Sequence, residues 1–363
     1  MHSKEILDWL KKYRLLSIAK NHSAHFKNIL KKSLNVRNDP IFIICDYGTP
    51  RHRIAPLMGG AYYFAAKKLG LDVKIVVQDV KNVGDSADQI IINTFKKISK
   101  PSVLVFNLSN KLGRLGSLGK SYRRYVKERK HRFTSALGMA SINTHDFYYI
   151  TRALNVNYVK LRRECVKLKK ALDWGREVIV QTSAGTDLKI NITGCKSIAN
   201  DGKYDLPGCG GNMPCGEVYI PPKIDTAEGK IIIDCSSKNI NGTRLVDKPI
   251  TIKVKKGIVT GIGGGYVAQM LKKSIAWAGR RTKNPSMVRQ IGELGIGMNP
   301  KANVVGAMVV DEKVLGTAHI ALGNNYWFGG DVFTIIHLDQ VFKNPKLFID
   351  GKEYKLPKKN DFL

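Results

Sequence analysis

The first half of the chain alternates continuous apolar runs with segments in which apolar residues recur every three to four positions. The apolar runs lie at 41–46, 73–77 and 103–108. The segments with helical spacing lie at 3–35, 55–69 and 85–98. A short apolar run that ends in a turn is typical of a strand buried on both faces, and strands that alternate with helices are typical of a parallel sheet. The pattern therefore predicts an N-terminal parallel α/β domain.

The pattern changes after a helix expected at 158–174, which has lysine and arginine on one face and leucine and valine on the other. Short strands separated by glycine, asparagine and proline are expected at 177–182, 188–192, 230–234, 250–254 and 304–310. One long helix is expected at 266–277. We therefore predict an α/β domain at residues 1–175 and a C-terminal β-rich domain at residues 176–363.

Composition fits this division, because 363 residues that are 43% hydrophobic can bury the cores of two domains. The first residues are charged and lack the apolar stretch of a signal peptide, and no window approaches the roughly 18 apolar residues of a membrane span. The 6 cysteines are scattered without a Cys-x-x-Cys pair, which is typical of reduced thiols. These features predict a soluble, cytoplasmic protein.

The chain is strongly basic, with 60 Lys and Arg against 29 Asp and Glu and a net charge of +31. Residues 1–200 hold 37 basic and 14 acidic residues, so the surplus lies mainly in the N-terminal half. The densest run, 111–132, contains Tyr122 and Tyr125, which could stack on bases while its cations engage phosphates. Dispersed charge favours a solvated basic face instead. We expect at most weak, non-specific nucleic-acid binding.

Candidate chemistry is concentrated near the C-terminus, where His319 is followed by His337 and Asp339 in an apolar, glycine-rich setting. His337 and Asp339 are two residues apart, so on a strand their side chains share a face and can reach one cation. Histidine with carboxylate suits Zn²⁺, Co²⁺, Mn²⁺ or Fe²⁺. Glu293 is the only acidic residue between 251 and 300 and needs a partner if it is buried.

Four ordered motifs give these residues a context. They are Asn212-Met-Pro-Cys-Gly-Glu217-Val, Gly292-Glu293, His319-Ile-Ala-Leu-Gly-Asn-Asn-Tyr326 and His337-Leu-Asp339. In this order they resemble the aminopeptidase T family of dinuclear, leucyl aminopeptidase-like metallo-aminopeptidases, over residues of about 140 to 350. The resemblance implies a metal-dependent hydrolase that removes the N-terminal residue of a peptide, and it implies a homodimer.

The resemblance also implies roles for particular residues. It implies two divalent ions, Zn, Co or Mn, held by Glu217, Glu293, His319, His337 and Asp339. Tyr326 would assist the oxyanion. Glu312 would be a ligand or a general base, although it stands seven residues before His319, about two more than in the family pattern.

Two other functions remain open on the sequence. A mononuclear Fe(II) ring-cleaving dioxygenase could use His319, His337 and Asp339 as a two-histidine, one-carboxylate triad, and such a branch resembles this family. A non-catalytic, basic nucleic-acid-associated protein would use the N-terminal half instead. The presence of both Glu217 and Glu293 favours two metals and hydrolysis.

Overall fold

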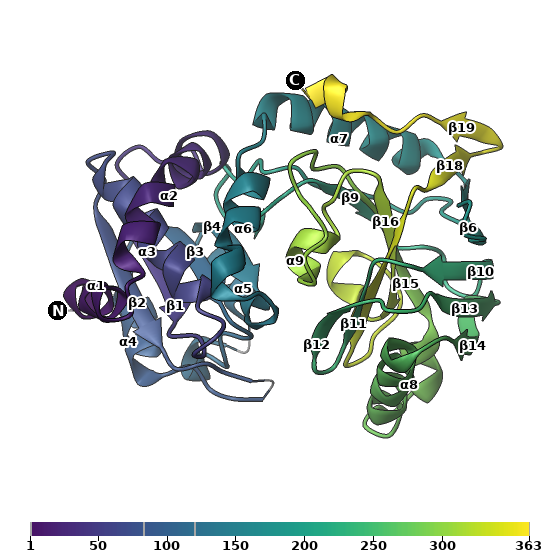
Figure 1. The fold of residues 1–363 in the computed structure, drawn as a ribbon, viewed down its shortest axis with the longest axis horizontal. Helices are drawn as coiled ribbons and strands as arrows, with labels where there is room; N and C mark the ends of the chain where they lie inside the picture. Colours follow the sequence, from purple (N-terminus) through teal and green to yellow (C-terminus); the bar gives the residue numbers. More distant parts are fainter. Residues whose placement is uncertain (1, 83, 120, 363) are drawn as a thin grey trace. The chain divides into compact units, whose positions relative to one another are not determined.

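The computed structural model describes residues 2–82, 84–119 and 121–362 (Figure 1). It divides into two compact units. The first unit comprises Met1–Tyr158 and Gly202–Cys215, and the second comprises Val159–Asp201 and Gly216–Leu363. The expected domain boundary at 175 stays a prediction.

The first unit is built on a five-stranded parallel sheet with the order β2-β1-β3-β4-β8. Its strands are β1 (Ile41–Asp46), β2 (Val73–Gln78), β3 (Val103–Leu108), β4 (Arg132–Leu137) and β8 (Gly210–Asn212). Its α-helices are α1 (His2–Lys12), α2 (Leu16–Asn28), α3 (Ile54–Lys67), α4 (Gln89–Lys97), α5 (Tyr122–Glu128) and α6 (Phe147–Leu154). A π-helical turn, η1 (Ile29–Ser33), and three 3-10 turns complete it, η2 (Gly116–Leu118), η3 (Met139–Ser141) and η4 (Thr144–Asp146). The predicted parallel α/β unit is confirmed.

The basic run at 111–132 is folded into this unit rather than held out as a separate module. Tyr125 on α5 is buried, stacks on Phe95 and donates its hydroxyl hydrogen to the Phe95 carbonyl oxygen at 2.8 Å. It is therefore not available for base stacking, which corrects one part of the expectation. Lys120, in the same run, lies outside the described residues.

The second unit contains two seven-stranded antiparallel sheets. The first, here the β5 sheet, has the order β14-β13-β10-β6-β5-β18-β19. Its strands are β5 (Glu177–Gln181), β6 (Asp187–Asn191), β10 (Glu228–Ile233), β13 (Ile250–Lys255), β14 (Ile258–Gly263), β18 (Lys346–Ile349) and β19 (Lys352–Tyr354). On β5, buried Val178 and Val180 alternate with more exposed residues, as expected of a sheet with one solvated face.

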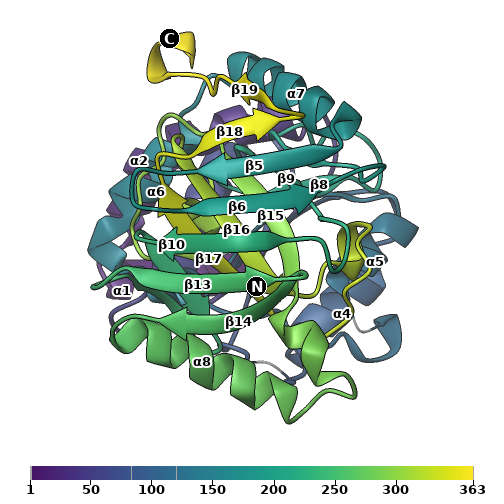
Figure 2. The same cartoon turned by 90° about the vertical axis from the view of Figure 1, so that its right-hand side faces the viewer.

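The second sheet, here the β16 sheet, has the order β12-β11-β17-β16-β15-β9-β7. Its strands are β7 (Ile198–Asn200), β9 (Glu217–Ile220), β11 (Ser236–Asn239), β12 (Gly242–Leu245), β15 (Ile291–Gly297), β16 (Thr317–Gly323) and β17 (His337–Lys343). Figure 2 shows the β5 sheet in front of β15, β16 and β17, and β10 contacts β17. Every residue of β15 and β16 is buried, so these strands form the centre of the unit. The predicted β-rich C-terminal part is confirmed.

The helices of this unit flank the sheets. They are α7 (Tyr158–Trp174), α8 (Tyr266–Gly279), the short α9 (Met308–Asp311) and the 3-10 turns η5 (Pro285–Arg289), η6 (Tyr326–Phe328) and η7 (Lys359–Phe362). Figure 2 shows α8 beside β14 and α7 at the opposite edge, near β19. In residues 2–82, 84–119 and 121–362, no helix combines the length and the apolar character that a bilayer span requires.

The strand expected at 304–310 does not form, and this prediction was wrong. The segment turns into α9 because the buried carboxylate of Asp311 accepts the backbone N–H of Val305 at 2.7 Å and of Gly306 at 3.0 Å. These bonds satisfy backbone donors that would otherwise need a neighbouring strand. Apolar composition alone could not reveal this competing partner.

Candidate metal centre

The residues predicted from sequence come together on four neighbouring strands of the β16 sheet. Glu217 begins β9, Glu293 lies on β15, His319 on β16, and His337 and Asp339 on β17. These strands are adjacent in the order β17-β16-β15-β9. Positions more than 100 residues apart in the chain are therefore only two or three strands apart in the sheet.

Antiparallel register places three of these side chains on one face. His319 pairs with Gly295 on β15, and Glu217 pairs with Gly297 on the same strand. Directly opposed residues in an antiparallel sheet point to the same side, and so do residues two apart on one strand. Glu293, two residues before Gly295, therefore points to the face that carries His319 and Glu217.

The two ligand-type residues of β17 join that face by the same rule. Asp339 pairs with Ala321, and His337 pairs with Gly323, on β16. Ala321 and Gly323 are two and four residues after His319, so both pairs lie on its face. Because the intervening residues are glycine and alanine, the face has room between its acidic and imidazole side chains.

The glycine at 295 is required by the packing of His319. A Cβ atom at Gly295 would lie 2.1 Å from Nε2 of His319, because the imidazole lies directly over the glycine backbone. The ring itself is fully buried, and its Nδ1 has no hydrogen-bond partner among the described residues. The Gly-Glu-Leu-Gly sequence of β15 thus combines a ligand-type carboxylate with the space for a neighbouring imidazole.

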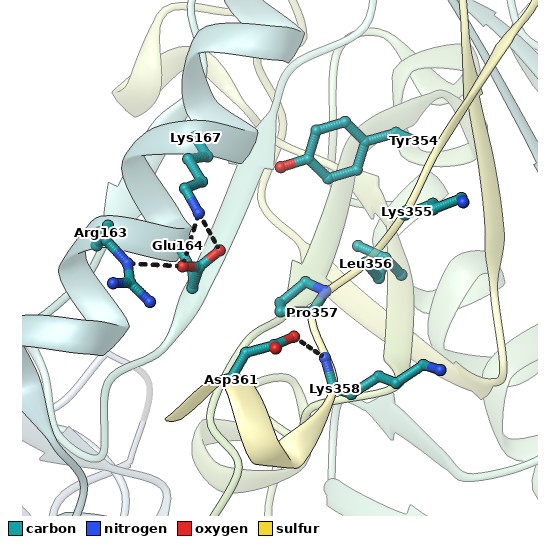
Figure 3. Close-up of a pocket in the computed structure, with 9 residues that line it drawn as sticks. All are labelled: Arg163, Glu164, Lys167, Tyr354, Lys355, Leu356, Pro357, Lys358 and Asp361. Carbon is teal, nitrogen blue, oxygen red and sulfur yellow. Dashed lines mark hydrogen bonds and ion pairs between the residues drawn. The ribbon is translucent and has the colours of Figure 1, made fainter. Parts of the chain in front are cut away.

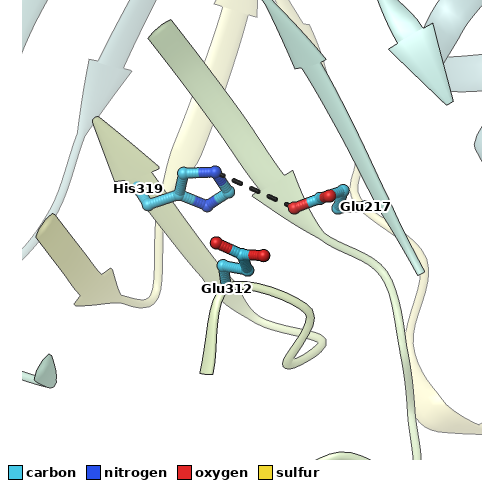
Figure 4. Close-up of side chains that lie close together, drawn as sticks. All are labelled: Glu217, Glu312 and His319. Atoms are coloured by element: carbon cyan, nitrogen blue, oxygen red, sulfur yellow. Dashed lines mark ion pairs between the residues drawn. The ribbon is translucent and has the colours of Figure 1, made fainter. Parts of the chain in front are cut away.

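The side chains form two groups that could each hold one ion, and the potential ligand atoms within each group lie within 4.8 Å of one another. The first group consists of Glu217, Glu312 and His319, which point toward one another in Figure 4. The second consists of Glu293, His337 and Asp339. The groups adjoin, since Nε2 of His319 lies 3.1 Å from Oε1 of Glu293.

The second group has the geometry of a preformed ligand set. Nδ1 of His337 donates to the carbonyl oxygen of Asn324 at 2.7 Å, which leaves Nε2 as the atom that faces the carboxylates. Nε2 lies 2.9 Å from Oδ1 of Asp339 and 3.6 Å from Oε2 of Glu293. Burial opposes the imidazolium form, but Asp339 and Glu293 outweigh it and raise the pKa of His337 to about 9.

Two lysines belong to the site and were missed in the sequence. Lys313, with a fully buried side chain, has its ammonium bonded to Oε1 of Glu217 and to Oε1 of Glu312. Lys238, on β11, reaches Oδ2 of Asp339 at 3.0 Å. The sequence signal was slight: Lys313 follows Glu312 directly, and a lysine beside an acidic residue is ordinarily a surface pair.

These lysines set the charge of the carboxylates. Burial favours neutral Lys313, but Glu217 and Glu312 raise its pKa, so it stays charged. Burial likewise disfavours ionised Asp339, but Lys238 and His337 hold the pKa of its carboxyl well below the usual range. Both groups are therefore rich in charge although most of their side chains are buried.

The predicted catalytic residues have different positions. Glu312, just after α9, reaches the first group in spite of its unusual spacing from His319. Tyr326 lies on η6, is 65% exposed and makes an edge contact with Phe333. Its predicted role stays a prediction. The rings nearest His337 are those of Trp327 and Phe328, with centroids 6.1 and 6.2 Å away.

A cavity elsewhere in the same unit shares none of these residues. It has a volume of about 540 Å³ and is lined by residues of α7 and of the segment after β19 (Figure 3). Its carboxylate Glu164 is already paired with Arg163 and Lys167, both at 2.9 Å. The β16 sheet, not this cavity, therefore gathers the metal-capable side chains.

Comparison with known sequences gives a consistent result. A family model for 2,5-dihydroxypyridine 5,6-dioxygenase (NicX) matches residues 150–355. The curated 2,5-dihydroxypyridine 5,6-dioxygenase of Pseudomonas putida strain KT2440 is 26% identical over 200 residues, which are 53% of this chain and 56% of that protein. The match therefore extends over only about half the length of this relative.

Solved structures share the fold at low identity. The 2,5-dihydroxypyridine dioxygenase from Pseudomonas putida KT2440 has a TM-score of 0.70 at 20% identity, covering 93% of this chain and 98% of that one. AmpT from Thermus thermophilus has a TM-score of 0.63 at 13% identity, with coverage of 93% and 98%. The expected likeness to the aminopeptidase T family is thus confirmed for the fold.

The function expected from that likeness was wrong. The family model and the curated relative are ring-cleaving dioxygenases, so the predictions of a metallo-aminopeptidase, a peptide hydrolase and a peptide substrate are overturned. The motifs misled because metal-ligand residues on a shared sheet persist when the reaction changes. The expected homodimer, cytoplasmic location and weak nucleic-acid binding stay predictions.

The two groups of metal-capable side chains agree with the expected metal-dependent enzyme. The match also covers β9, β15, β16 and β17, the strands that carry these groups. The chain belongs to the 2,5-dihydroxypyridine 5,6-dioxygenase family, NicX.

Proposed function

We propose that this protein is an Fe(II)-dependent oxidoreductase that opens a small hydroxylated aromatic ring, with a dihydroxypyridine as the first candidate substrate. The observation that carries the proposal is the second group, Glu293, His337 and Asp339, in a chain of this family. Imidazole suits iron, and this set differs from the expected two-histidine, one-carboxylate triad because Glu293 takes the place of His319, which lies in the first group. The expected aminopeptidase ligands thus take a different role.

The charges of the site favour a single ion. Four carboxylates face it, from Glu217, Glu293, Glu312 and Asp339. Lys238 and Lys313 neutralise two of them. One divalent ion with neutral histidines balances the remaining two, whereas a second ion would leave a buried positive excess.

The substrate class follows from the side chains beside His337. Trp327, which is 53% exposed, and buried Phe328 present aromatic rings next to the His337 imidazole. Tyr219 adds a third ring, 5.2 Å from that of Phe328. Aromatic walls favour a flat ring through edge and offset contacts. We infer that this cluster, Tyr219, Trp327 and Phe328, binds the substrate's ring while its hydroxyl groups face the acidic site.

The reaction needs no reductant besides the substrate. One bond of the ring breaks, both atoms of dioxygen enter the product, and dioxygen is the oxidant. Fe(II) held by Glu293, His337 and Asp339 would supply the redox chemistry that dioxygen needs. His337, fixed through its Nδ1 bond to Asn324, presents Nε2 to the ion, and His319 orients Glu293 through their 3.1 Å contact.

Oxygen consumption tests the proposal directly. The protein is loaded anaerobically with Fe²⁺, its iron content is measured, and oxygen uptake is followed with 2,5-dihydroxypyridine and with catechol. We expect uptake with a dihydroxylated ring, one dioxygen per ring opened, and its loss in Asp339→Asn. Iron-loaded protein that consumes no oxygen with a panel of dihydroxylated pyridines and benzenes would refute the proposal.

A further inference from the structure

Lys313 occupies an unusual place for a lysine. It lies between α9 and β16, and none of its side chain is exposed. Its ammonium bonds Oε1 of Glu217 and Oε1 of Glu312, the two carboxylates that face His319 in Figure 4. A buried lysine is costly unless anionic partners hold it, and these two carboxylates provide them.

An ion in the first group would bind the same two carboxylates, and the Glu217 oxygen that faces His319 is Oε2, 3.9 Å from Nε2. A metal bound to Glu217 and Glu312 lies roughly 2 Å from its carboxylate oxygens, whereas an ammonium lies about 2.8 Å from them. The ion and the Lys313 ammonium would therefore share two carboxylates in a buried setting, where two positive charges repel each other more strongly than in water. None of the Lys313 side chain is exposed, so an ammonium displaced by the ion would stay buried unless the surrounding residues moved.

The second group differs in this respect. Its lysine, Lys238, contacts only the Oδ2 side of Asp339 and is 37% exposed. Its ammonium can shift toward solvent when an ion binds and still stay beside Asp339, since long lysine side chains hold their ammonium in water at little cost. Only the second group can therefore bind a metal without leaving a displaced lysine ammonium buried.

We propose that Lys313 takes the place of a second divalent ion, holding Glu217 and Glu312 so that the chain binds one ion, at Glu293, His337 and Asp339. The inference deepens the proposed function and rests on its assignment of the second group as the iron site. It makes Lys313 a positioning residue that sets the number of metals. A site with ligands for two ions thereby operates with one.

The number of Mn²⁺ ions bound per chain tests the inference about Lys313 without a catalytic assay. Metal-stripped protein is titrated with Mn²⁺, the bound metal is measured by elemental analysis, and the electron paramagnetic resonance spectrum is recorded. Wild type should saturate at one equivalent with the spectrum of an isolated ion. Lys313→Met should bind two equivalents, with the spectrum of a coupled pair, because Glu217 and Glu312 are then left without a cation and can hold the second ion.

Control variants test whether the second ion depends on Lys313 itself and not on the loss of any lysine from the site. Lys238→Met removes the lysine of the other group and should stay at one equivalent. Glu312→Gln combined with Lys313→Met removes one ligand of the opened site and should return to one equivalent. Lys313→Arg keeps the cation and should also bind one.

The outcomes are distinct. Two equivalents in wild type, or one in a folded Lys313→Met protein, overturn the inference. Should Lys313→Met fold only with added Mn²⁺, its two equivalents support the inference; should it not fold at all, the wild-type count decides. A change from one to two ions in a protein without oxygenase activity would retain the inference and reject only the proposed reaction.

Discussion

Two histidines, buried His131 in the first unit and partly buried His337 in the second, have opposite electrostatic surroundings. His131, just before β4, is 1% exposed, and its Nδ1 accepts the backbone N–H of Ser102 at 3.0 Å. Burial and then Arg129 lower its pKa to about 4. His337 on β17 is partly buried, which by itself lowers its pKa, yet Asp339 and Glu293 raise the pKa to about 9.

The difference shows what burial alone does to an imidazole and what a site adds to it. Loss of water disfavours the charged ring in both places, and His131 has a backbone amide and an arginine as neighbours. At His337 two carboxylates from neighbouring strands reverse the shift. A histidine that is buried among acids is placed for a cation, whereas His131 is part of the packing.

The largest expected effect is on metal affinity and comes from removing a carboxylate that faces His337. Asp339→Asn removes the charge that faces Nε2 of His337 and one ligand of the proposed ion. We expect the dissociation constant for Mn²⁺ or Fe²⁺ to rise at least about 100-fold. Isothermal titration of metal-stripped protein measures it. His131→Asn serves as the control and should leave metal affinity unchanged; equal losses in the two variants would contradict the distinction.

The next largest expected effect is on stability and comes from filling the space beside the His319 imidazole. Gly295→Ala would bring a Cβ atom to 2.1 Å from Nε2 of His319, so the ring or the strand must move. We expect a loss of about 2–3 kcal/mol in the free energy of unfolding, measured with urea. Gly263→Ala on β14 has nothing within 4 Å and an ordinary backbone angle, so it should cost much less. Similar losses would show that His319 does not constrain this strand.

The loss of stability in acid tests the surroundings of His131. Its folded pKa of about 4 lies below the ordinary value of 6.5, so between these values the unfolded chain binds more protons. Stability is therefore lost as the pH falls from about 6.5 to 4, by about 1–3 kcal/mol. His131→Asn keeps an acceptor for Ser102 and cannot charge, so its urea midpoint should change less over this range. A variant with the slope of wild type would show that other groups cause the acid sensitivity.

The smallest effect concerns the exposed lysine of the site. Lys238 competes with a metal for Asp339, but an ion pair with an exposed partner contributes only about 0.2–1 kcal/mol. Lys238→Met should therefore bind Mn²⁺ about two- to fivefold more tightly. Titration calorimetry at moderate salt measures it. Weaker binding would mean that Lys238 orients Asp339 rather than competing with the ion.

Much of the fold could be predicted from local pattern. The apolar run at 41–46 and the helix at 158–174 have the predicted bounds in the structure, as β1 and α7. Such elements depend on neighbours along the chain, so periodicity reports them. The segment at 304–310 failed because its backbone is satisfied by Asp311, a partner that pattern does not reveal. The helix expected at 3–35 is interrupted near Arg14, which has a positive φ of 57°.

The candidate site was predictable in its residue types but not in its balance of charge. Glu217, Glu293, His319, His337 and Asp339 were all found from motifs, and the structure places them on one sheet face. Their reaction was misassigned, because the same ligand types serve hydrolysis and oxygen chemistry. The lysines lacked any motif, and the two-ion expectation omitted their charge.

The sequence by itself determined that this chain alternates strands and helices before turning β-rich, and that His337 and Asp339, two residues apart on a strand, share one face. Those properties are local, since they follow from spacing along a strand or a helix. Only the tertiary structure decided that Gly295 makes room for His319 and that Lys313 lies between Glu217 and Glu312. Register between strands and burial of charge depend on distant segments, because hydrogen bonding and desolvation act through space and not along the chain.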